Sequence, residues 1–299
     1  MKEPKYLREG DTVWITATAR KMTLEEIKPA ILLLKKWGYK VKIGKVIGLE
    51  DHQFAGTDRE RSDDFNAAVR DPEVKAIWCV RGGYGTVRMV DHIDFELLKQ
   101  HPKWLIGYSD ITVLHSHLHN KGVASLHATM PVDLGTIKNK ALASLKSVLS
   151  GEPTSYKIPF TNDNKLGECK GQLVGGNLSV LYSMLGSESS IDTNGKILFL
   201  EDLDEYLYHI DRMLMNLKRN GYFENLKGLV IGGMTKMHDN TIPFGKNATE
   251  IIIDITSEYN FPIAFNFPAG HIKDNRTLIL GKEAILKVHK DFTFLDMNV

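Results

Sequence analysis

The stretch KWLIGYSDITVLHSHLHNKG, residues 103–122, joins a short apolar run to a pattern that is typical of a helix. The apolar run Trp104-Leu105-Ile106 is followed by a glycine, and Ser109 stands at the junction with the expected helix. A strand that leads directly into a helix is the repeating unit of α/β sheets. Ser109 therefore has two interpretations. Its hydroxyl either projects from a sharp strand-to-helix turn as a nucleophile or caps the helix.

The same alternation of strand and helix continues through the first half of the chain. Residues 12–17, 41–43 and 74–80 have the composition of strands, and residues 24–37 and 57–69 have helical patterns. This order predicts an α/β fold with a parallel sheet and helices on both faces. Each strand ends in small or polar residues, at the edge where open α/β sheets bind ligands.

The length of 299 residues favours two domains over one hydrophobic core. Residues 151–164 contain Pro, Gly, Thr and Asn in place of a periodic apolar pattern, which is typical of a linker. We therefore predict an N-terminal domain over residues 1–150 and a smaller C-terminal α/β domain, with antiparallel strands, over residues 165–299. The strands expected in the C-terminal domain are 196–200, 228–231, 277–280, 284–289 and 293–295, and its expected helices are 177–185 and 207–220.

The composition argues against several classes of function. The chain has 38 basic and 37 acidic residues, so its net charge of +1 gives no long-range attraction for nucleic acid or an anionic membrane. Its two cysteines, Cys79 and Cys169, lack the spacing of a zinc site or a disulfide framework. No apolar run reaches the roughly 18 residues of a membrane span, and no signal-peptide pattern is recognisable. We expect a cytoplasmic protein without a membrane or nucleic-acid partner.

A serine hydroxyl acts as a nucleophile when a base takes its proton and a third group holds that base. Two candidate partners stand at loop ends: His271 in a loop rich in Pro and Gly, and Glu201 at the end of an apolar strand. Each also has a structural explanation, as a surface histidine and as one of several solvated acids. Ile111 replaces the second glycine of the G-x-S-x-G elbow, so local sequence leaves the helix cap open for Ser109.

The loop Arg81-Gly82-Gly83-Tyr84-Gly85 follows a buried strand and can bring backbone N–H groups close to a substrate. Nucleotide binding is a poor fit, because the loop lacks the third glycine of the dinucleotide fingerprint and the chain has no P-loop. His115 and His119 share one helix face with His117 between them, but no HExxH motif accompanies them and we interpret them as structural. We expect no metal and no cofactor.

Several short motifs are distributed along nearly the whole chain, in an order and spacing more specific than any one of them. They are Ala55-Gly56-Thr57-Asp58 with Arg61 and Asn66-Ala67-Ala68, Asp71-Pro72-Glu73-Val74, Arg81-Gly82-Gly83-Tyr84-Gly85, Ile106-Gly107-Tyr108-Ser109-Asp110, Gly175-Gly176-Asn177, Leu200-Glu201-Asp202 and Gly270-His271. Together these motifs resemble the serine LD-carboxypeptidase family, which includes murein tetrapeptide carboxypeptidases and microcin immunity peptidases.

The resemblance implies a Ser-Glu-His triad, with Ser109 as nucleophile, His271 as general base and acid, and Glu201 as the group that orients His271. It also implies an oxyanion hole of backbone N–H groups, which we assign to Gly83 and Asp110. Members of the family have an N-terminal flavodoxin-like or amidotransferase-like domain and a C-terminal domain that carries the Glu and the His. They are commonly homodimers, and the mechanism requires neither a metal nor a cofactor.

The expected reaction is cleavage of the amide between an L-centred diamino acid and the terminal D-alanine of a murein tetrapeptide, a step of peptidoglycan recycling. Tyr84 and Asn177 flank glycines in the motifs and are candidates to line the substrate pocket. Residues 15–20, ITATAR, depart from the Ser-Pro-rich turn of many relatives, which leaves the shape of that pocket edge open. The sequence does not identify the group that holds the terminal carboxylate.

Three other functions remain open at this stage. The first is a peptidase that hydrolyses an aminoacyl-nucleotide antibiotic such as processed microcin, for which an aromatic partner for adenine in the second-domain loops is expected. The second is a non-catalytic module that binds a peptide or a sugar, with Ser109 only a cap. The third is an α/β-hydrolase esterase, which shares the chain order Ser, acid, His but not the two-domain organisation.

Overall fold

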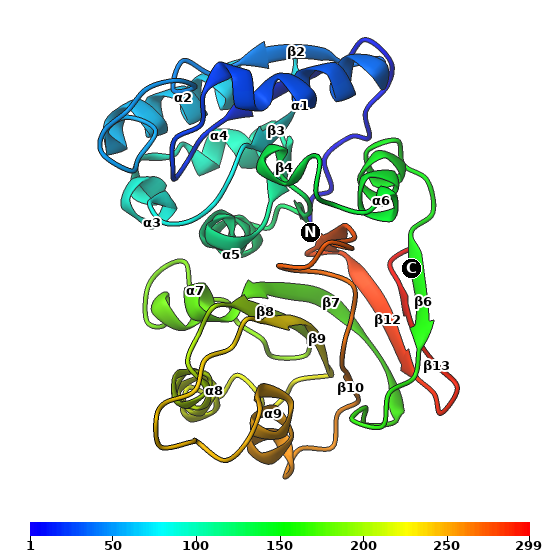
Figure 1. Cartoon of the computed structure of the whole chain (residues 1–299). Helices are drawn as coiled ribbons and strands as arrows, with labels where there is room; N and C mark the ends of the chain where they lie inside the picture. Colours follow the sequence, from blue (N-terminus) through cyan, green and yellow to red (C-terminus); the bar gives the residue numbers. More distant parts are fainter.

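The N-terminal half of the chain forms the parallel sheet that its alternating pattern predicts. Figure 1 shows this sheet in the upper part of the computed structural model, which describes residues 1–299. The strand order is β11-β5-β4-β3-β1-β2, and every neighbouring pair is parallel except β11 with β5. The strands are β1 (Thr12–Thr16), β2 (Lys40–Ile43), β3 (Val74–Cys79), β4 (Trp104–Gly107), β5 (Ser125–His127) and β11 (Leu278–Leu280).

Helices cover both faces of this sheet. In β3, Ile77 and Cys79 pack with the helices α2, α4 and α5, whereas Ala76 and Trp78 pack with α1 and α6, as the period of two along a strand requires. Thr23 and Thr57 begin α1 and α2 as capping boxes, each with a glutamate three residues later. The helices are α1 (Leu24–Lys36), α2 (Asp58–Arg70), α3 (Thr86–Met89), α4 (Phe95–Gln100), α5 (Thr112–Asn120) and α6 (Asn139–Leu149), with 3₁₀ turns η1 (Val90–His92), η2 (Ser109–Ile111) and η3 (Pro131–Asp133).

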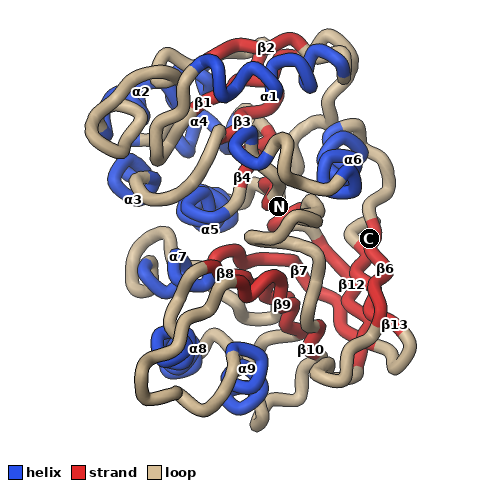
Figure 2. Tube along the Cα trace, viewed as in Figure 1, coloured by secondary structure: helices blue, strands red, loops and turns tan.

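A second, mixed sheet lies below the first in Figures 1 and 2, with strand order β10-β9-β8-β7-β12-β13-β6. The long strand β7 joins its two parts, because its first half pairs antiparallel with β12 and its second half pairs parallel with β8. The remaining elements are β6 (Ser155–Pro159), β7 (Gly167–Asn177), β8 (Ile197–Leu203), β9 (Gly228–Thr235), β10 (Ile263–Ala264), β12 (Glu283–Val288) and β13 (Phe292–Asp296), and the helices α7 (Leu178–Ser183), α8 (Leu207–Arg219) and α9 (Ala248–Thr256). The two-sheet α/β architecture with antiparallel strands in the second sheet confirms the predicted fold class.

Two local predictions differ from the structure. The expected linker, residues 151–164, contains β6, an edge strand in which Tyr156 and Ile158 are buried between exposed neighbours. This alternation spans only five residues between turn-forming segments, too little to stand out in the sequence. The expected strand at 277–280 belongs to the first sheet rather than the second, because β11 pairs antiparallel with β5.

The two halves pack against each other through a continuous apolar layer. Helix α5 contacts both β7 and α7, and Figure 2 shows α5 and α7 facing each other between the sheets. One cluster of buried side chains includes Phe65 of α2, Leu114 of α5 and Leu214 of α8. The core therefore crosses the expected domain boundary, and side chains from the two halves are held at fixed distances from each other.

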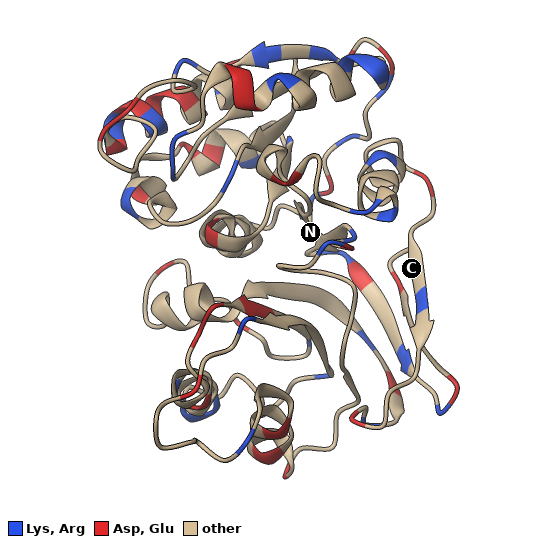
Figure 3. Ribbon diagram, viewed as in Figure 1, with Lys and Arg blue, Asp and Glu red and all other residues tan.

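The surface matches the even charge balance of the sequence. Figure 3 shows Lys and Arg interspersed with Asp and Glu over both halves of the molecule. None of the helices combines the length and the apolar character that crossing a membrane requires.

Candidate active site

Ser109 lies at the carboxyl end of β4, as the first residue of η2. Its φ is 64°, in the left-handed region, which costs a residue other than glycine about 1 kcal/mol or more. Neither η2 nor α5 has a side-chain cap, so the helix-cap interpretation of Ser109 is wrong. Its Oγ instead lies 3.1 Å from Nε2 of His271. Strain of this kind at a strand-to-helix turn is typical of a nucleophile elbow.

The position of Ile111 explains why the elbow does not need its second glycine. A Cβ on Gly107 would lie 2.8 Å from Cγ1 of Ile111, so the side chain of Ile111 occupies the space over the glycine that precedes Ser109. Close approach in this turn is thus provided by Gly107, on the strand side of the serine. Although Ile111 replaces the second glycine of G-x-S-x-G, Gly107 provides the space that the turn needs, and the turn at Ser109 stays sharp.

His271 is held by Glu201, a fully buried residue of β8. The backbone N–H and Nδ1 of His271 donate to Oε2 of Glu201 at 3.0 and 2.7 Å. Because a carboxylate only accepts, Nδ1 carries the proton and the lone pair of Nε2 faces Ser109. Tyr108 packs against the imidazole with ring centroids 4.9 Å apart, which fixes the ring from the side.

The electrostatics of this pair favour a charged imidazole. Burial alone lowers the pKa of His271, but the charge of Glu201 and the hydrogen bond to it outweigh burial, and the pKa is raised. Burial alone raises the pKa of Glu201, but the charge of His271 and its hydrogen bonds outweigh burial, and the pKa is lowered. Glu201 is therefore ionised at neutral pH and stabilises the imidazolium that forms when His271 takes a proton.

The chain path explains how a residue of the second half reaches Ser109. His271 lies in the loop between β10 of the second sheet and β11 of the first, so this loop must cross from one sheet to the other. A hydrogen bond within this loop stabilises its conformation, because Oδ1 of Asn275 accepts from the backbone N–H of Gly270 at 2.8 Å. The pairing of β11 with β5 therefore anchors the histidine beside the elbow.

The glycine loop after β3 lies directly over Ser109. A Cβ on Gly82 would lie 3.0 Å from Oγ of Ser109 and 3.1 Å from the backbone nitrogen of Asp110. Gly83 has φ of 113°, a conformation that favours glycine. The N–H groups of Gly83 and Asp110, the predicted oxyanion donors, have no hydrogen-bond acceptor within the protein. The loop and the elbow thus leave two backbone donors available beside the hydroxyl.

A buried network below the loop keeps its shape. The Asp110 carboxylate accepts from the N–H of Thr86 at 2.9 Å, and burial raises its pKa despite this bond and the nearby arginines. The guanidinium of Arg61 is fully buried and donates to the carbonyls of Thr18 and Gly85 at 2.6 and 3.0 Å. Arg61, one of the motif residues in the sequence, thus ties the ends of β1 and the glycine loop together.

The two predicted pocket residues have different positions. Asn177 lines the cleft, caps α7, and donates to Asp202 at 2.9 Å and to Glu201 at 3.4 Å. Tyr84 is not among the lining residues, because its ring turns outward, is 46% exposed, and packs on Phe54. The prediction that Tyr84 lines the pocket is therefore wrong.

The cleft has a volume of about 460 Å³ and is lined by both halves of the chain. Its walls also contain charged residues to which the sequence analysis gave no role, namely Arg20, Arg81, Asp202, Asp204 and Glu205. Burial, and then the charge of Glu201, raise the pKa of Asp202 to about 7. The only sequence signal for these residues was their place within or beside motifs and strand ends, and that signal does not separate them from ordinary surface charges.

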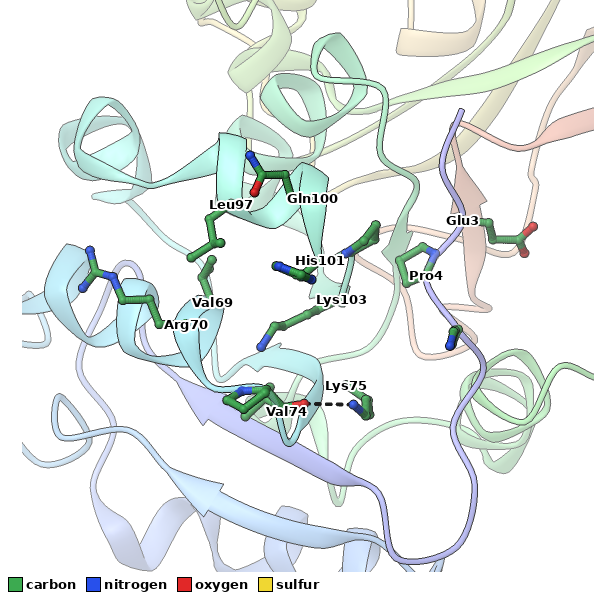
Figure 4. Close-up of a pocket in the computed structure, with 13 residues that line it drawn as sticks. Glu3, Pro4, Val69, Arg70, Val74, Lys75, Leu97, Gln100, His101 and Lys103 are labelled. Atoms are coloured by element: carbon green, nitrogen blue, oxygen red, sulfur yellow. Dashed lines mark hydrogen bonds between the residues drawn. The ribbon is translucent and has the colours of Figure 1, made fainter.

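A larger cavity, of about 550 Å³, lies elsewhere (Figure 4). It opens at the amino ends of β3 and β4, between the labelled Val74, Lys103 and Gln100, on the edge of the sheet opposite to Ser109. None of the predicted site residues lines it. The residues that line this cavity include no series of hydroxyl, imidazole and carboxylate groups like the one in the cleft.

The histidines of α5 are part of the packing. His115 is fully buried, with Nδ1 2.8 Å from Oγ of Ser125 and Nε2 2.9 Å from the carbonyl oxygen of Gly107. His117 stacks on Phe95 with ring centroids 4.1 Å apart. No three His, Cys, Asp or Glu side chains of the chain converge as metal ligands would.

A hydroxyl on a strained turn, an imidazole and a buried carboxylate in hydrogen-bonding series form the constellation that hydrolases of several unrelated folds use. The comparisons with known proteins agree with this class. The LD-carboxypeptidase N-terminal domain matches residues 13–128, and the LD-carboxypeptidase C-terminal domain matches residues 170–286. The chain belongs to the LD-carboxypeptidase family of peptidases, which confirms the resemblance seen in the sequence.

Individual relatives cover the whole chain. A probable murein peptide carboxypeptidase of Bacillus subtilis is 34% identical over 99% of this chain and 95% of its own length. The crystal structure of muramoyltetrapeptide carboxypeptidase from Oxalobacter formigenes is 30% identical and superposes with a TM-score of 0.89, over 96% of this chain and 99% of that one. A microcin self-immunity protein of Escherichia coli is 24% identical over 92% of this chain and 90% of its own length.

Proposed function

We propose that this protein is a serine LD-carboxypeptidase that removes the terminal D-alanine from a murein tetrapeptide, at the amide that follows an L-centred diamino acid. The observation that carries the proposal is the hydrogen-bonded series from Ser109 through His271 to the buried Glu201. The names of the Bacillus and Oxalobacter relatives support the substrate class.

In the proposed mechanism, Nε2 of His271 takes the proton of the Ser109 hydroxyl as Oγ attacks the carbonyl carbon of the scissile amide. The N–H groups of Gly83 and Asp110 stabilise the oxyanion, and Glu201 stabilises the imidazolium. The C–N bond then breaks as His271 gives its proton to the nitrogen of the departing D-alanine. A water molecule, deprotonated by His271, hydrolyses the acyl-enzyme ester and restores the Ser109 hydroxyl.

Several features support this division of roles. The distance of 3.1 Å between Nε2 of His271 and Oγ of Ser109 is within the range for proton transfer, and the proton on Nδ1 leaves Nε2 free to act as base. The raised pKa of His271 also helps it to hold the proton until the leaving nitrogen takes it. The two N–H donors lie beside the hydroxyl without a competing acceptor in the protein.

A second candidate substrate is an aminoacyl nucleotide of the microcin type. The observation that favours it is a pair of exposed tyrosines on the second half, Tyr206 and Tyr208, with ring centroids 5.6 Å apart. Tyr206 directly follows Glu205, which lines the cleft, so its ring is available to stack on an adenine near the cleft mouth. The similarity to the self-immunity protein of Escherichia coli agrees with this candidate, although it is weaker than the similarity to the Bacillus relative.

The experiment that tests the proposal compares the two substrates. Purified protein is incubated with a murein tetrapeptide or with an aminoacyl sulfamoyl adenosine, and the products are identified by mass spectrometry. We expect release of D-alanine from the tetrapeptide with a kcat/KM at least 100-fold above that for the nucleotide. The reverse preference would establish the second candidate, and failure to cleave either substrate would contradict the proposed reaction.

A homodimer and a cytoplasmic location remain predictions from the family resemblance and from the sequence. Neither is required for the proposed chemistry, because Ser109, His271 and Glu201 all come from one chain.

A further inference from the structure

The cleft walls beside Ser109 carry opposite charges. Among the lining residues, only Arg20 and Arg81 have a fixed positive charge, and both come from the N-terminal half. That half also contributes Asp110, but its carboxylate is buried and accepts from the N–H of Thr86. The facing wall, from the second half, carries the carboxyl groups of Asp202, Asp204 and Glu205. A substrate group with a negative charge is therefore attracted to the first wall and repelled from the second.

Arg20 lies close to the nucleophile. A Cβ on Gly83 would lie 2.6 Å from Cδ and 2.7 Å from Nε of Arg20, so this side chain runs across the backbone of the glycine loop. The preceding glycine of the same loop, Gly82, is the one that approaches Oγ of Ser109. A backbone bridge to Phe54 fixes the position of Arg20 at the end of the first strand's loop.

The guanidinium of Arg20 has no ion pair or hydrogen bond with any other residue of the chain, although it has five N–H donors. The other arginine near the loop, Arg61, differs in both respects. Arg61 is fully buried, forms an ion pair with Asp58, and donates hydrogen bonds to backbone carbonyl oxygens. Arg20 is exposed and its donors remain available to a ligand.

The charges of Arg20 and Arg81 act on different acids. Hydrogen bonds from Thr23 are the main cause of the lowered pKa of Glu26, on helix α1, and the charge of Arg81 adds to them, whereas burial raises the pKa of Asp110 and the charge of Arg20 partly offsets that effect. Of the two arginines that line the cleft, Arg20 is the one whose side chain runs across Gly83, one of the two predicted oxyanion donors.

We propose that Arg20 binds the free carboxylate of the substrate's terminal amino acid and so makes this site a carboxypeptidase rather than an endopeptidase. The inference rests on the proposed function. In such a substrate the carboxylate carbon is three bonds from the scissile carbonyl carbon, roughly 4 Å away, so the carboxylate must bind beside the oxyanion loop, and the side chain of Arg20 runs across that loop in the same cleft. A guanidinium accepts the two oxygens of a carboxylate side by side, which fixes the leaving amino acid in one orientation.

The assignment also concerns the segment at the end of the first strand, residues 15–20. The end of the first strand, ITATAR, supplies an arginine. The structure brings that arginine into the cleft. The binding group that the sequence did not identify therefore lies in the segment whose shape it left open.

The test crosses one protein variant with one change in the substrate. The parent, Arg20→Gln and Arg20→Lys are assayed on a murein tetrapeptide and on the same peptide with its terminal carboxylate converted to an amide. The matched control is Lys21→Gln, which removes a neighbouring charge that is paired with Glu50 and does not line the cleft. Release of the D-alanine or its amide is followed by mass spectrometry.

We expect the parent and the Lys21→Gln variant to prefer the free acid by about 10- to 100-fold in kcat/KM, the range for a charged hydrogen bond. Arg20→Gln should lose this factor on the acid, mainly through KM, while its rate on the amide stays within about threefold of the parent. Arg20→Lys should keep part of the preference, because an ammonium retains the charge but not the paired geometry.

The outcomes separate the inference from the function on which it rests. If Arg20→Gln loses activity equally on the acid and the amide, Arg20 has a structural role and the inference is wrong, although the proposed function stands. The same conclusion follows if Lys21→Gln lowers the preference as much as Arg20→Gln does. If the parent cleaves neither peptide, the proposed function fails and the assignment of Arg20 fails with it.

Discussion

Replacing Glu201 by Gln tests how the site makes His271 a base. The change keeps the shape of the side chain but replaces an acceptor oxygen by an N–H₂ group. In the parent, Oε2 accepts from two groups of His271, the backbone N–H at 3.0 Å and Nδ1 at 2.7 Å. A glutamine that keeps its oxygen in that place retains both bonds but lacks the negative charge that stabilises the imidazolium. An amide N–H₂ in that place would oppose the backbone N–H of His271 and move the imidazole proton to Nε2, which could then no longer accept the proton of Ser109.

The expected loss follows from the missing charge in either orientation of the amide, and also from the change of tautomer when the N–H₂ group faces Nδ1. In a serine protease the equivalent change from acid to amide lowers kcat about 10⁴-fold. We expect Glu201→Gln to lower kcat by about 10³- to 10⁴-fold, which is about 4 to 5.5 kcal/mol of transition-state stabilisation. KM should change little, because Glu201 is fully buried behind the histidine and does not contact the substrate.

The assay measures D-alanine release under saturating and limiting substrate, with circular dichroism to show that the variant is folded. The matched control is Asp202→Asn, since Asp202 is also buried and adjacent in β8 but makes no hydrogen bond to His271. We expect that control to lose less than about tenfold. A folded Glu201→Gln protein that keeps kcat within about tenfold of the parent would refute the orienting role of Glu201.

Three further predictions concern pH, the glycine loop and assembly. Because the pKa of His271 is raised above 6.5 and that of Glu201 is lowered below 4.5, log kcat/KM should rise with pH through a pKa above 6.5. The contribution of the pair to the free energy of unfolding depends on pH in another way. The contribution of Glu201 is lost as pH falls through its lowered pKa, and the contribution of His271 is lost as pH rises through its raised pKa. Thermal unfolding should therefore show the largest stabilisation by the pair at a lower pH than the plateau of activity. In Gly82→Ala the added methyl would lie 3.0 Å from Oγ of Ser109. This variant should lower kcat/KM at least about 100-fold with little change in Tm. Activity within about threefold of the parent would contradict the close approach of this loop to Ser109. Sedimentation should give twice the chain mass of 33.7 kDa, and a single species at 33.7 kDa would contradict the homodimer.

Much of the N-terminal half follows from local pattern. The segments 12–17, 24–37 and 74–80 have clear strand or helix periodicity, and the structure places β1, α1 and β3 there. Strand ends with glycine or serine then locate the cleft, because the carboxyl ends of parallel strands share one edge. These signals are short-range, so one sequence is enough to find them.

The long-range features did not follow from pattern. The strand β11 is short, with three buried apolar residues, and nothing local shows that it pairs with β5 some 150 residues earlier rather than with its neighbours in sequence. That pairing brings His271 to Ser109. The local sequence therefore indicated candidate residues for the triad but did not show that they lie close together in the fold. The order of motifs shared with a known family supplied the missing long-range information.

The outward turn of Tyr84 and the inward position of Arg20 show a second limit. Both residues lie beside small residues at strand ends, and the sequence gives no sign of which side chain enters the cleft. Side-chain direction there depends on glycine conformations, such as φ of 113° at Gly83, that only the folded loop defines.

The central claim is that Ser109 forms a covalent acyl-enzyme during turnover. The most direct measurement mixes the protein with a murein tetrapeptide, quenches with acid within the first turnover, and locates any added mass by peptide mapping. We predict a mass equal to the substrate minus D-alanine on the peptide that contains Ser109, and no such mass in Ser109→Ala, while the exposed-helix control Ser183→Ala retains the adduct and the activity. Continued release of D-alanine by Ser109→Ala, or turnover by the parent with the added mass on another residue, would contradict the account.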